Sequence, residues 1–122
     1  MCTKKILIVD DNELIVEVMS YILSNSGYEV SSLNTGEGVI AAVSRTQPDL
    51  VILDDTLPYM RATEICSILK LNQSTHDTPV IICSGNEEAE SALMQNGAAD
   101  DFLLKPFDMS ALLNKVEHQL AA

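Results

Sequence analysis

Acidic residues that directly follow short apolar runs are the most informative feature of this sequence. Asp54 follows the run Leu50–Leu53. Asp10 and Asp11 follow the run Ile6–Val9. Short runs of this kind, rich in β-branched residues, are typical of buried strands in a parallel sheet. Ligands of open α/β sheets bind beyond the carboxyl ends of the strands, so we expect these carboxylates to crowd at one edge. Such crowding requires a cation or raised pKa values.

Two further apolar runs end beside residues that would complete a site at this edge. The run Pro79–Cys83 precedes Ser84, and the run Asp101–Leu104 precedes Lys105. Carboxylates suit a hard divalent cation such as Mg²⁺, which takes oxygen ligands. The cation, the Lys105 ammonium and the Ser84 hydroxyl would each neutralise or hydrogen-bond an oxygen of an incoming phosphoryl group. Asp54, in the centre, would attack phosphorus as a carboxylate nucleophile and form an aspartyl phosphate.

Five βα units are expected to position these residues. The expected strands are Lys5–Val9, Glu29–Leu33, Leu50–Leu53, Pro79–Cys83 and Asp101–Leu104. Amphipathic patterns predict helices over about Asn12–Ser26, Gly38–Arg45, Thr63–Leu71, Glu87–Gln95 and Ser110–Leu120. This alternation predicts an α/β fold with a parallel sheet that helices cover on both faces. The 122 residues fit a single domain, residues 1–122.

Individual residues predict the helix ends and the apolar faces. Gly27 should end the first helix. Thr35 is a candidate N-cap of the second helix, and Asp108 or Ser110 of the fifth. The expected apolar faces are Leu14, Val18, Ile22 and Leu23 in the first helix, Ile65, Ile68 and Leu69 in the third, and Leu112, Leu113, Val116 and Leu120 in the fifth.

Composition and charge argue against several classes of partner. The formal net charge is −11, from 18 acidic and 7 basic residues. Nucleic acid and anionic membranes both attract clustered Lys and Arg, so neither is expected as a direct partner. No apolar run approaches the ~20 residues of a membrane span, and no secretory signal peptide is visible. Cys2, Cys66 and Cys83 lack metal-ligand spacing and fit a reducing, cytoplasmic setting.

The order and spacing of these motifs resemble the receiver domain of two-component response regulators, of the chemotaxis-regulator type. The matching segments are Ile6–Asn12, Leu53–Pro58, Cys83–Gly85 and Gly97–Phe107, and the resemblance extends from Lys5 to Leu120. It implies a flavodoxin-like sheet of five parallel strands in the order 2-1-3-4-5. The pair Arg61–Ala62 stands where the family usually has an acidic residue and a Gly. A loop of different shape is expected there.

The resemblance assigns the phosphoryl and metal chemistry to particular positions. Asp54 would be the phosphoacceptor. Asp11 would bind Mg²⁺ directly, Asp10 would assist, often through water, and the backbone carbonyl of Thr56 would be a further ligand. Asp54 would also contact the cation. Thr56 and Asn86 would tune the lifetime of the phosphoryl group.

The resemblance also implies a switch. Ser84 would hydrogen-bond the phosphoryl group and move on activation, and Lys105 would pair with a phosphoryl oxygen. The Lys105–Pro106 bond would be cis. A pocket would open for Phe102, whose ring would change rotamer together with the movement of Ser84. The surface formed by the fourth helix, the fifth strand and the fifth helix, roughly Asn86–Gln119, would carry the signal.

The implied function is a phosphoacceptor signalling switch that takes its phosphoryl group from a histidine kinase or a phosphotransfer protein. The chain would not be an enzyme beyond self-phosphorylation and slow autodephosphorylation. It would control a downstream protein or an output domain, with phosphorylation-dependent homodimerisation as an option. The sequence leaves open whether the receiver stands alone or is a piece of a longer regulator or hybrid kinase.

Three alternatives are weighed against this function. A constitutive interaction module would not need the acids, Ser84 and Lys105. A phosphohydrolase with an aspartate nucleophile would need a second acid where Thr56 stands. A flavin-binding protein is disfavoured because the acidic loop after the first strand would repel a cofactor phosphate. Asp55 is interpreted as solvent-facing and not catalytic.

Overall fold

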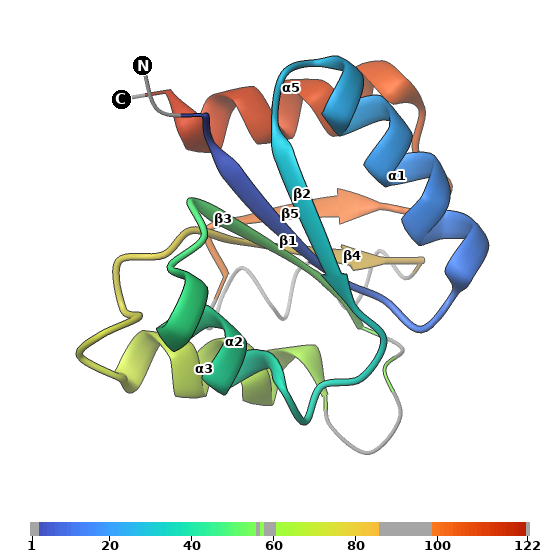
Figure 1. The fold of residues 1–122 in the computed structure, drawn as a ribbon. Coiled ribbons are helices and arrows are strands. Elements are labelled where there is room, and N and C mark those ends of the chain that lie inside the picture. The colour runs from blue at the N-terminus through green and yellow to red at the C-terminus, as the bar shows by residue number, and fades with distance from the viewer. Residues whose placement is uncertain (1–2, 56, 58–60, 86–98, 122) are drawn as a thin grey trace.

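A five-stranded parallel sheet forms the centre of the molecule (Figure 1). The computed structural model describes residues 3–55, 57, 61–85 and 99–121. The strands are β1 (Lys5–Val9), β2 (Glu29–Leu33), β3 (Leu50–Asp54), β4 (Val80–Ser84) and β5 (Asp101–Leu104). Their order is β2-β1-β3-β4-β5, and each neighbouring pair is parallel. The fold class and the strand order predicted from the sequence are therefore confirmed.

Helices cover both faces of this sheet. They are α1 (Glu13–Asn25), α2 (Val39–Thr46), α3 (Ala62–Leu71) and α5 (Met109–Leu120). Helices α1 and α5 lie on one face, and α2 and α3 lie on the other (Figure 1). The helix predicted over Glu87–Gln95 lies outside the described residues. None of the helices that the structure describes is long and apolar enough to cross a membrane.

The helix ends mostly agree with the caps expected from the sequence. Helix α1 also has a cap that was not predicted, because the Asn12 side chain accepts hydrogen bonds from two amides of its first turn, at 3.1 and 3.2 Å. Gly27, just after α1, has a φ of 96°, which glycine adopts at low cost. Asp108 caps α5 through the amide of Ala111, at 2.7 Å. Thr35 is not the cap of α2, because the helix begins at Val39, too far along the chain for the Thr35 side chain to serve its first turn.

The core consists of two aliphatic layers, one on each face of the sheet. Successive strand residues point to opposite faces, so each strand contributes to both layers. The layer under α1 and α5 includes Ile6, Ile8, Met19, Leu23, Leu50, Ile52, Ile81, Cys83, Leu103, Leu112 and Val116. The layer under α2 and α3 includes Leu7, Val9, Val39, Val43, Val51, Leu53, Ile65, Cys66, Leu69, Val80, Ile82 and Phe102.

The apolar faces predicted for α1 and α3 are partly wrong. Leu14 and Val18 are 67% and 48% exposed, although both were expected to pack on the sheet. Helix α1 instead buries Met19 together with Ile22 and Leu23. Ile68 of α3 is exposed as well. These helices carry apolar residues around more of their circumference than one sheet face covers, so helical periodicity alone did not decide which flank packs.

Candidate functional site

Three charged residues lie on one face of the sheet at its carboxyl edge, because the side chains of a strand alternate between the two faces. Asp54 is the last residue of β3, and Asp10 and Lys105 directly follow β1 and β5. Each stands two positions after a strand residue of the layer under α1 and α5, namely Ile8, Ile52 or Leu103. Because alternate strand residues share a face, the side chains converge although they are far apart in the sequence.

The carboxylates of Asp10, Asp11 and Asp54 form a cluster suited to a cation. One oxygen from each lies within 4.8 Å of those from the other two. Asp10 and Asp54 are buried and Asp11 is exposed, so the cluster opens to solvent on one side. A hard divalent cation with oxygen ligands and retained waters fits this donor set.

Lys105 supplies the positive charge that the structure places against this cluster. Its Nζ donates to Asp54 Oδ1 at 2.7 Å and to Asp10 Oδ2 at 3.4 Å. The second oxygen of Asp10, Oδ1, accepts from the Asn12 amide at 2.9 Å. The peptide bond between Lys105 and Pro106 is cis.

The pKa values of Asp10 and Lys105 reflect this crowding. Burial raises the pKa of Asp10, and the charge of Asp54 adds to the increase, against the opposing effects of the Asn12 amide and of Lys105. Burial alone would lower the pKa of Lys105, but its hydrogen bond and ion pair with Asp54, followed by the charge of Asp10, outweigh burial and raise it. The ammonium is therefore held in its charged form.

Ser84 and Phe102 belong to the other face of the sheet. Ser84 is the last residue of β4 and is buried. It stands two positions after Ile82, which is the register partner of Phe102 on β5. Phe102 is also buried, within the layer under α2 and α3. Thr56 and Asn86, predicted from the family resemblance, lie outside the described residues.

Asp55 differs from its interpretation as a solvent-facing residue. Its amide donates to the Cys83 carbonyl at 3.0 Å, which continues the β3–β4 ladder one step beyond β3 and holds Asp55 against the end of β4. The residue is half-buried. Its Oδ1 is buried and has no hydrogen-bond partner among the residues that the structure describes. The sequence signal for this burial was the position of Asp55 directly after the fully buried strand β3.

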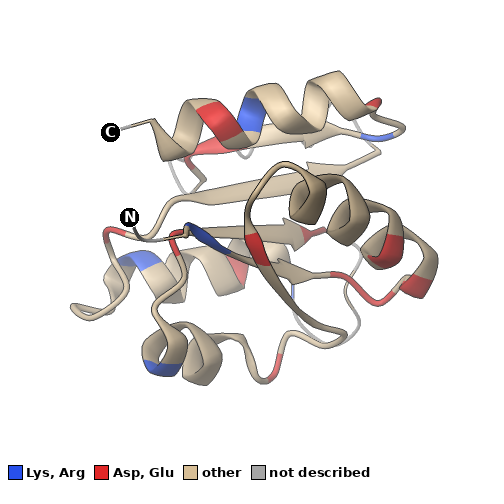
Figure 2. Ribbon diagram, turned by 45° about the horizontal axis from the view of Figure 1, so that its top comes forward, with Lys and Arg blue, Asp and Glu red and all other residues tan. Residues whose placement is uncertain are grey.

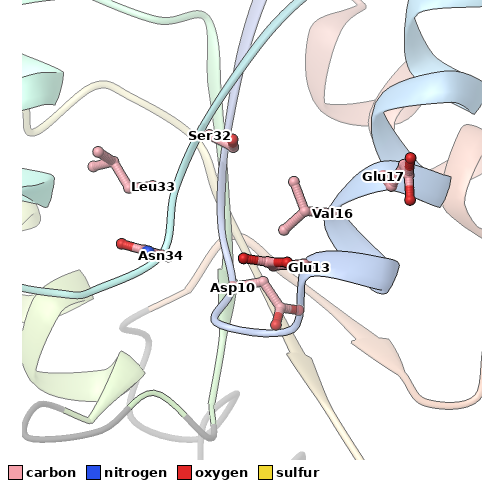
Figure 3. Close-up of a pocket in the computed structure, with 7 residues that line it drawn as sticks. All are labelled: Asp10, Glu13, Val16, Glu17, Ser32, Leu33 and Asn34. Atoms are coloured by element: carbon pink, nitrogen blue, oxygen red, sulfur yellow. The ribbon is translucent and has the colours of Figure 1, made fainter.

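Two clefts lie beside the site, one lined in part by Asp10 of the cluster and the other in part by Lys105. One, of about 630 Å³, is lined by Asp10, Glu13, Val16, Glu17, Ser32, Leu33 and Asn34 (Figure 3). Figure 3 shows Asp10 beside Glu13 where β1 turns into α1, so acidic groups line the approach to the cluster. The other, of about 430 Å³, is apolar and is lined by Leu14, Ile15, Val18, Met19, Lys105, Pro106 and Phe107. Sequence reasoning had not singled out Glu13 or Glu17, because exposed helical acids are common.

The distribution of charge over the molecule favours cations at this edge. Basic residues are few, whereas acidic residues mark the loop after β1 and helix α1 (Figure 2). The whole chain carries a formal charge of −11. An electrostatic field of this sign concentrates cations and disfavours anions unless a cation is present.

Comparisons with known proteins agree with the fold and the site. The family model of the response regulator receiver domain matches residues 6–117. The alkaline phosphatase synthesis transcriptional regulatory protein PhoP of Bacillus subtilis is 37% identical over 85% of this chain and 43% of its own length. The dual master transcriptional regulator RpaA of Synechocystis is 33% identical over 92% of this chain and 47% of its own length. The chain thus spans about half the length of these relatives.

Solved structures give the same result. A putative response regulator from Chloroflexus aurantiacus superimposes with a TM-score of 0.92 at 29% identity, covering 99% of this chain and 100% of that one. The chemotaxis response regulator CheY4 of Vibrio cholerae gives a TM-score of 0.89 at 26% identity, covering 98% and 100%. The chain belongs to the family of response regulator receiver domains.

Proposed function

We propose that this receiver domain is a phosphoacceptor switch that takes a phosphoryl group onto Asp54 with the help of Mg²⁺. The observation that carries this proposal is the placement of Asp54 at the centre of the site. One of its oxygens lies 2.7 Å from the Lys105 ammonium, and its carboxylate is clustered with Asp10 and Asp11. The donor is a phosphohistidine of a histidine kinase or a phosphotransfer protein.

The transfer exchanges one bond to phosphorus for another. An oxygen of the Asp54 carboxylate forms the new bond, while the bond from phosphorus to the donor imidazole breaks and that nitrogen keeps the electron pair. Asp10, Asp11 and Asp54, with the Thr56 carbonyl expected from the family, would hold Mg²⁺. The cation, when bound, neutralises charge on the transferring group.

Lys105 has two partners in succession. Before transfer it neutralises Asp54, so that buried acids are tolerated at the edge of the sheet. After transfer it pairs with an oxygen of the phosphoryl group that Asp54 carries. The raised pKa of Lys105 supports this role, because a charged ammonium is needed at both stages.

Phosphorylation then shifts a population between two states of the domain. The phosphoryl group adds roughly −1.5 to −2 charge, which draws the Ser84 hydroxyl towards Asp54. Phe102 responds on the same face of the sheet as Ser84, and the signal reaches the surface of roughly Asn86–Gln119. Thr56 and Asn86 tune how long the phosphoryl group persists.

The domain works in the cytoplasm with a kinase or phosphotransfer protein on one side and a downstream protein or output domain on the other. Because the domain is acidic, it does not bind nucleic acid itself. The relative MtrA of Mycobacterium tuberculosis is named a DNA-binding response regulator, and this chain covers 50% of its length. Beyond self-phosphorylation and slow autodephosphorylation it has no enzymatic activity.

Acetyl phosphate or beryllofluoride with Mg²⁺ tests the proposal. Intact-protein mass spectrometry after acetyl phosphate treatment should show the addition of one phosphoryl group to wild type and none to an Asp54→Asn variant. An Asp77→Asn variant, which makes the same chemical change at an exposed residue outside the cluster, should behave as wild type. Equal modification of the Asp54→Asn variant would remove Asp54 from its assigned role.

A further inference from the structure

Only three residues, Asp10–Asn12, connect β1 to α1. The first two supply carboxylates to the cluster with Asp54. Figure 3 shows Asp10 at the point where β1 turns into α1. The third residue, Asn12, is exposed and has no part in the transfer described above. In so short a connection, the direction of the two carboxylates depends on how Asn12 is held.

Asn12 is fixed to the first turn of α1. Its side-chain Oδ1 accepts from the amides of Leu14 and Ile15, at 3.1 and 3.2 Å, and its carbonyl accepts from the amide of Val16, at 3.1 Å. The first amides of a helix have no partner within the helix, so a capping side chain satisfies donors that would otherwise bond to water. The backbone of Asn12 is extended, with a φ of −90° and a ψ of 105°. The cap therefore sets the direction in which the amide of Asn12 points.

That amide points back to Asp10. It donates to Asp10 Oδ1 at 2.9 Å, while Oδ2 of the same carboxylate accepts from Lys105 Nζ at 3.4 Å. The backbone amide of Asp10 donates to the Leu33 carbonyl at 3.1 Å. Asp10 is thus held by β2, by Lys105 and by Asn12. A substitution of Asn12 can loosen the third of these contacts while the other two stay in place.

We infer that Asn12 is a positioning residue for Mg²⁺: by capping α1 it directs its own amide at Asp10, and so holds Asp10 and Asp11 in the geometry that binds the cation. Mg²⁺ demands near-ideal octahedral geometry, so carboxylates that are free to rotate bind it less well. Partners that orient metal ligands typically change metal affinity by 10- to 100-fold when they are removed. The inference rests on the proposed function, since it assumes a cation at Asp10, Asp11 and Asp54.

Two substitutions of Asn12 separate its cap from its other properties. Asn12→Ala removes the capping oxygen but keeps the backbone amide, so only the restraint on the direction of the amide is lost. We therefore expect the Kd for Mg²⁺ to rise by about three- to ten-fold, at or below the lower end of the usual range. Asn12→Ser keeps a capping oxygen, because serine caps helices about as well as asparagine, and its Kd should stay within about two-fold of wild type. Neither substitution changes the net charge.

Isothermal titration of the 122-residue protein with MgCl₂ measures these values, and Asn72→Ala is the matched control. The Asn72 side chain also accepts from a backbone amide two positions along the chain, that of Ser74, at 3.0 Å. It lies between α3 and β4, at the opposite edge of the sheet from the cluster. Asn72→Ala should therefore bind Mg²⁺ within about two-fold of wild type.

Hydrogen exchange in the metal-free protein gives a readout that does not depend on the cation. The amide of residue 12 should exchange more slowly than in the unfolded chain in wild type and in Asn12→Ser, because it is bonded to the Asp10 carboxylate. In Asn12→Ala this protection should fall, while the protection of the β1 amides is kept. Full protection of the residue 12 amide in Asn12→Ala would overturn the inference.

The outcomes also distinguish positioning from a purely structural role and from the proposed function. A lower Tm of Asn12→Ala with unchanged Mg²⁺ affinity would show that the cap serves only the helix, and a failure of Asn12→Ser to restore affinity would likewise refute positioning by the cap. In either case the phosphoacceptor proposal stands, provided that wild type binds Mg²⁺. If wild type binds no Mg²⁺, both the role of Asn12 and the metal part of the proposed function are refuted.

Discussion

Replacing Lys105 with Met tests the electrostatic logic of the site. The substitution keeps a long side chain but removes the charge that lies 2.7 Å from Asp54 Oδ1 and 3.4 Å from Asp10 Oδ2. The side chains of Asp54 and Asp10 are only 2% and 4% exposed, and that of Lys105 is 21% exposed. Removing one partner of a buried ion pair leaves an uncompensated charge, which typically costs 3–5 kcal/mol. Because Lys105 is partly exposed, we expect about 3 kcal/mol.

Urea unfolding without divalent cations measures this cost. In thermal unfolding, the same loss of about 3 kcal/mol in unfolding free energy would lower the Tm of a domain of this size by about 10 °C. Mg²⁺ should restore part of the lost stability, since a bound cation replaces the missing positive charge. The stabilisation that Mg²⁺ provides should therefore be larger in Lys105→Met than in wild type.

Lys115→Met is the matched control. Lys115 also forms one ion pair, with Asp101 Oδ1 at 2.9 Å, but its side chain is 41% exposed. Exposed pairs contribute less than about 1 kcal/mol, so this variant should lose little stability and show no additional response to Mg²⁺. If Lys105→Met were as stable as Lys115→Met without Mg²⁺, the view that Lys105 compensates buried carboxylates would be wrong.

Three further predictions concern pH, packing and the aromatic residue of β5. The pKa of Lys105 is raised above 10.5 in the folded state, so its stabilising contribution is complete below that pH and is lost as the pH rises through the folded-state value. The decrease in Tm that wild type shows at alkaline pH should therefore be smaller in Lys105→Met. Leu112→Ala should cost about 2–5 kcal/mol in urea unfolding because Leu112 is fully buried, whereas Leu14→Ala should cost less than about 0.5 kcal/mol. In unphosphorylated protein labelled with fluorinated phenylalanine, replacing H₂O by D₂O should shift the ¹⁹F resonance of buried Phe102 less than that of half-buried Phe107. Equal shifts of the two resonances would contradict the burial of Phe102.

Local patterns in the sequence predicted the sheet and the residues at its edge. The five apolar runs placed Asp10, Asp54, Ser84 and Lys105 at strand ends, because strand length and apolar character are properties of a few neighbouring residues. Parallel strands then require these ends to share one edge. The same local reasoning identified the Asn12–Ser26 helix, which the structure shows as Glu13–Asn25 with Asn12 as its cap.

Tertiary structure decided what depends on packing between distant segments. The sequence placed Lys105 at the site, but its 2.7 Å contact with Asp54 arises from the side-by-side arrangement of β3, β4 and β5. Periodicity alone did not show that Leu14 faces solvent, because exposure depends on which flank of α1 meets the sheet. The burial of Asp55 likewise depends on β4, to which its amide bonds. Residue types and their order therefore specified the chemistry available, and the contacts between strands determined how those groups are paired.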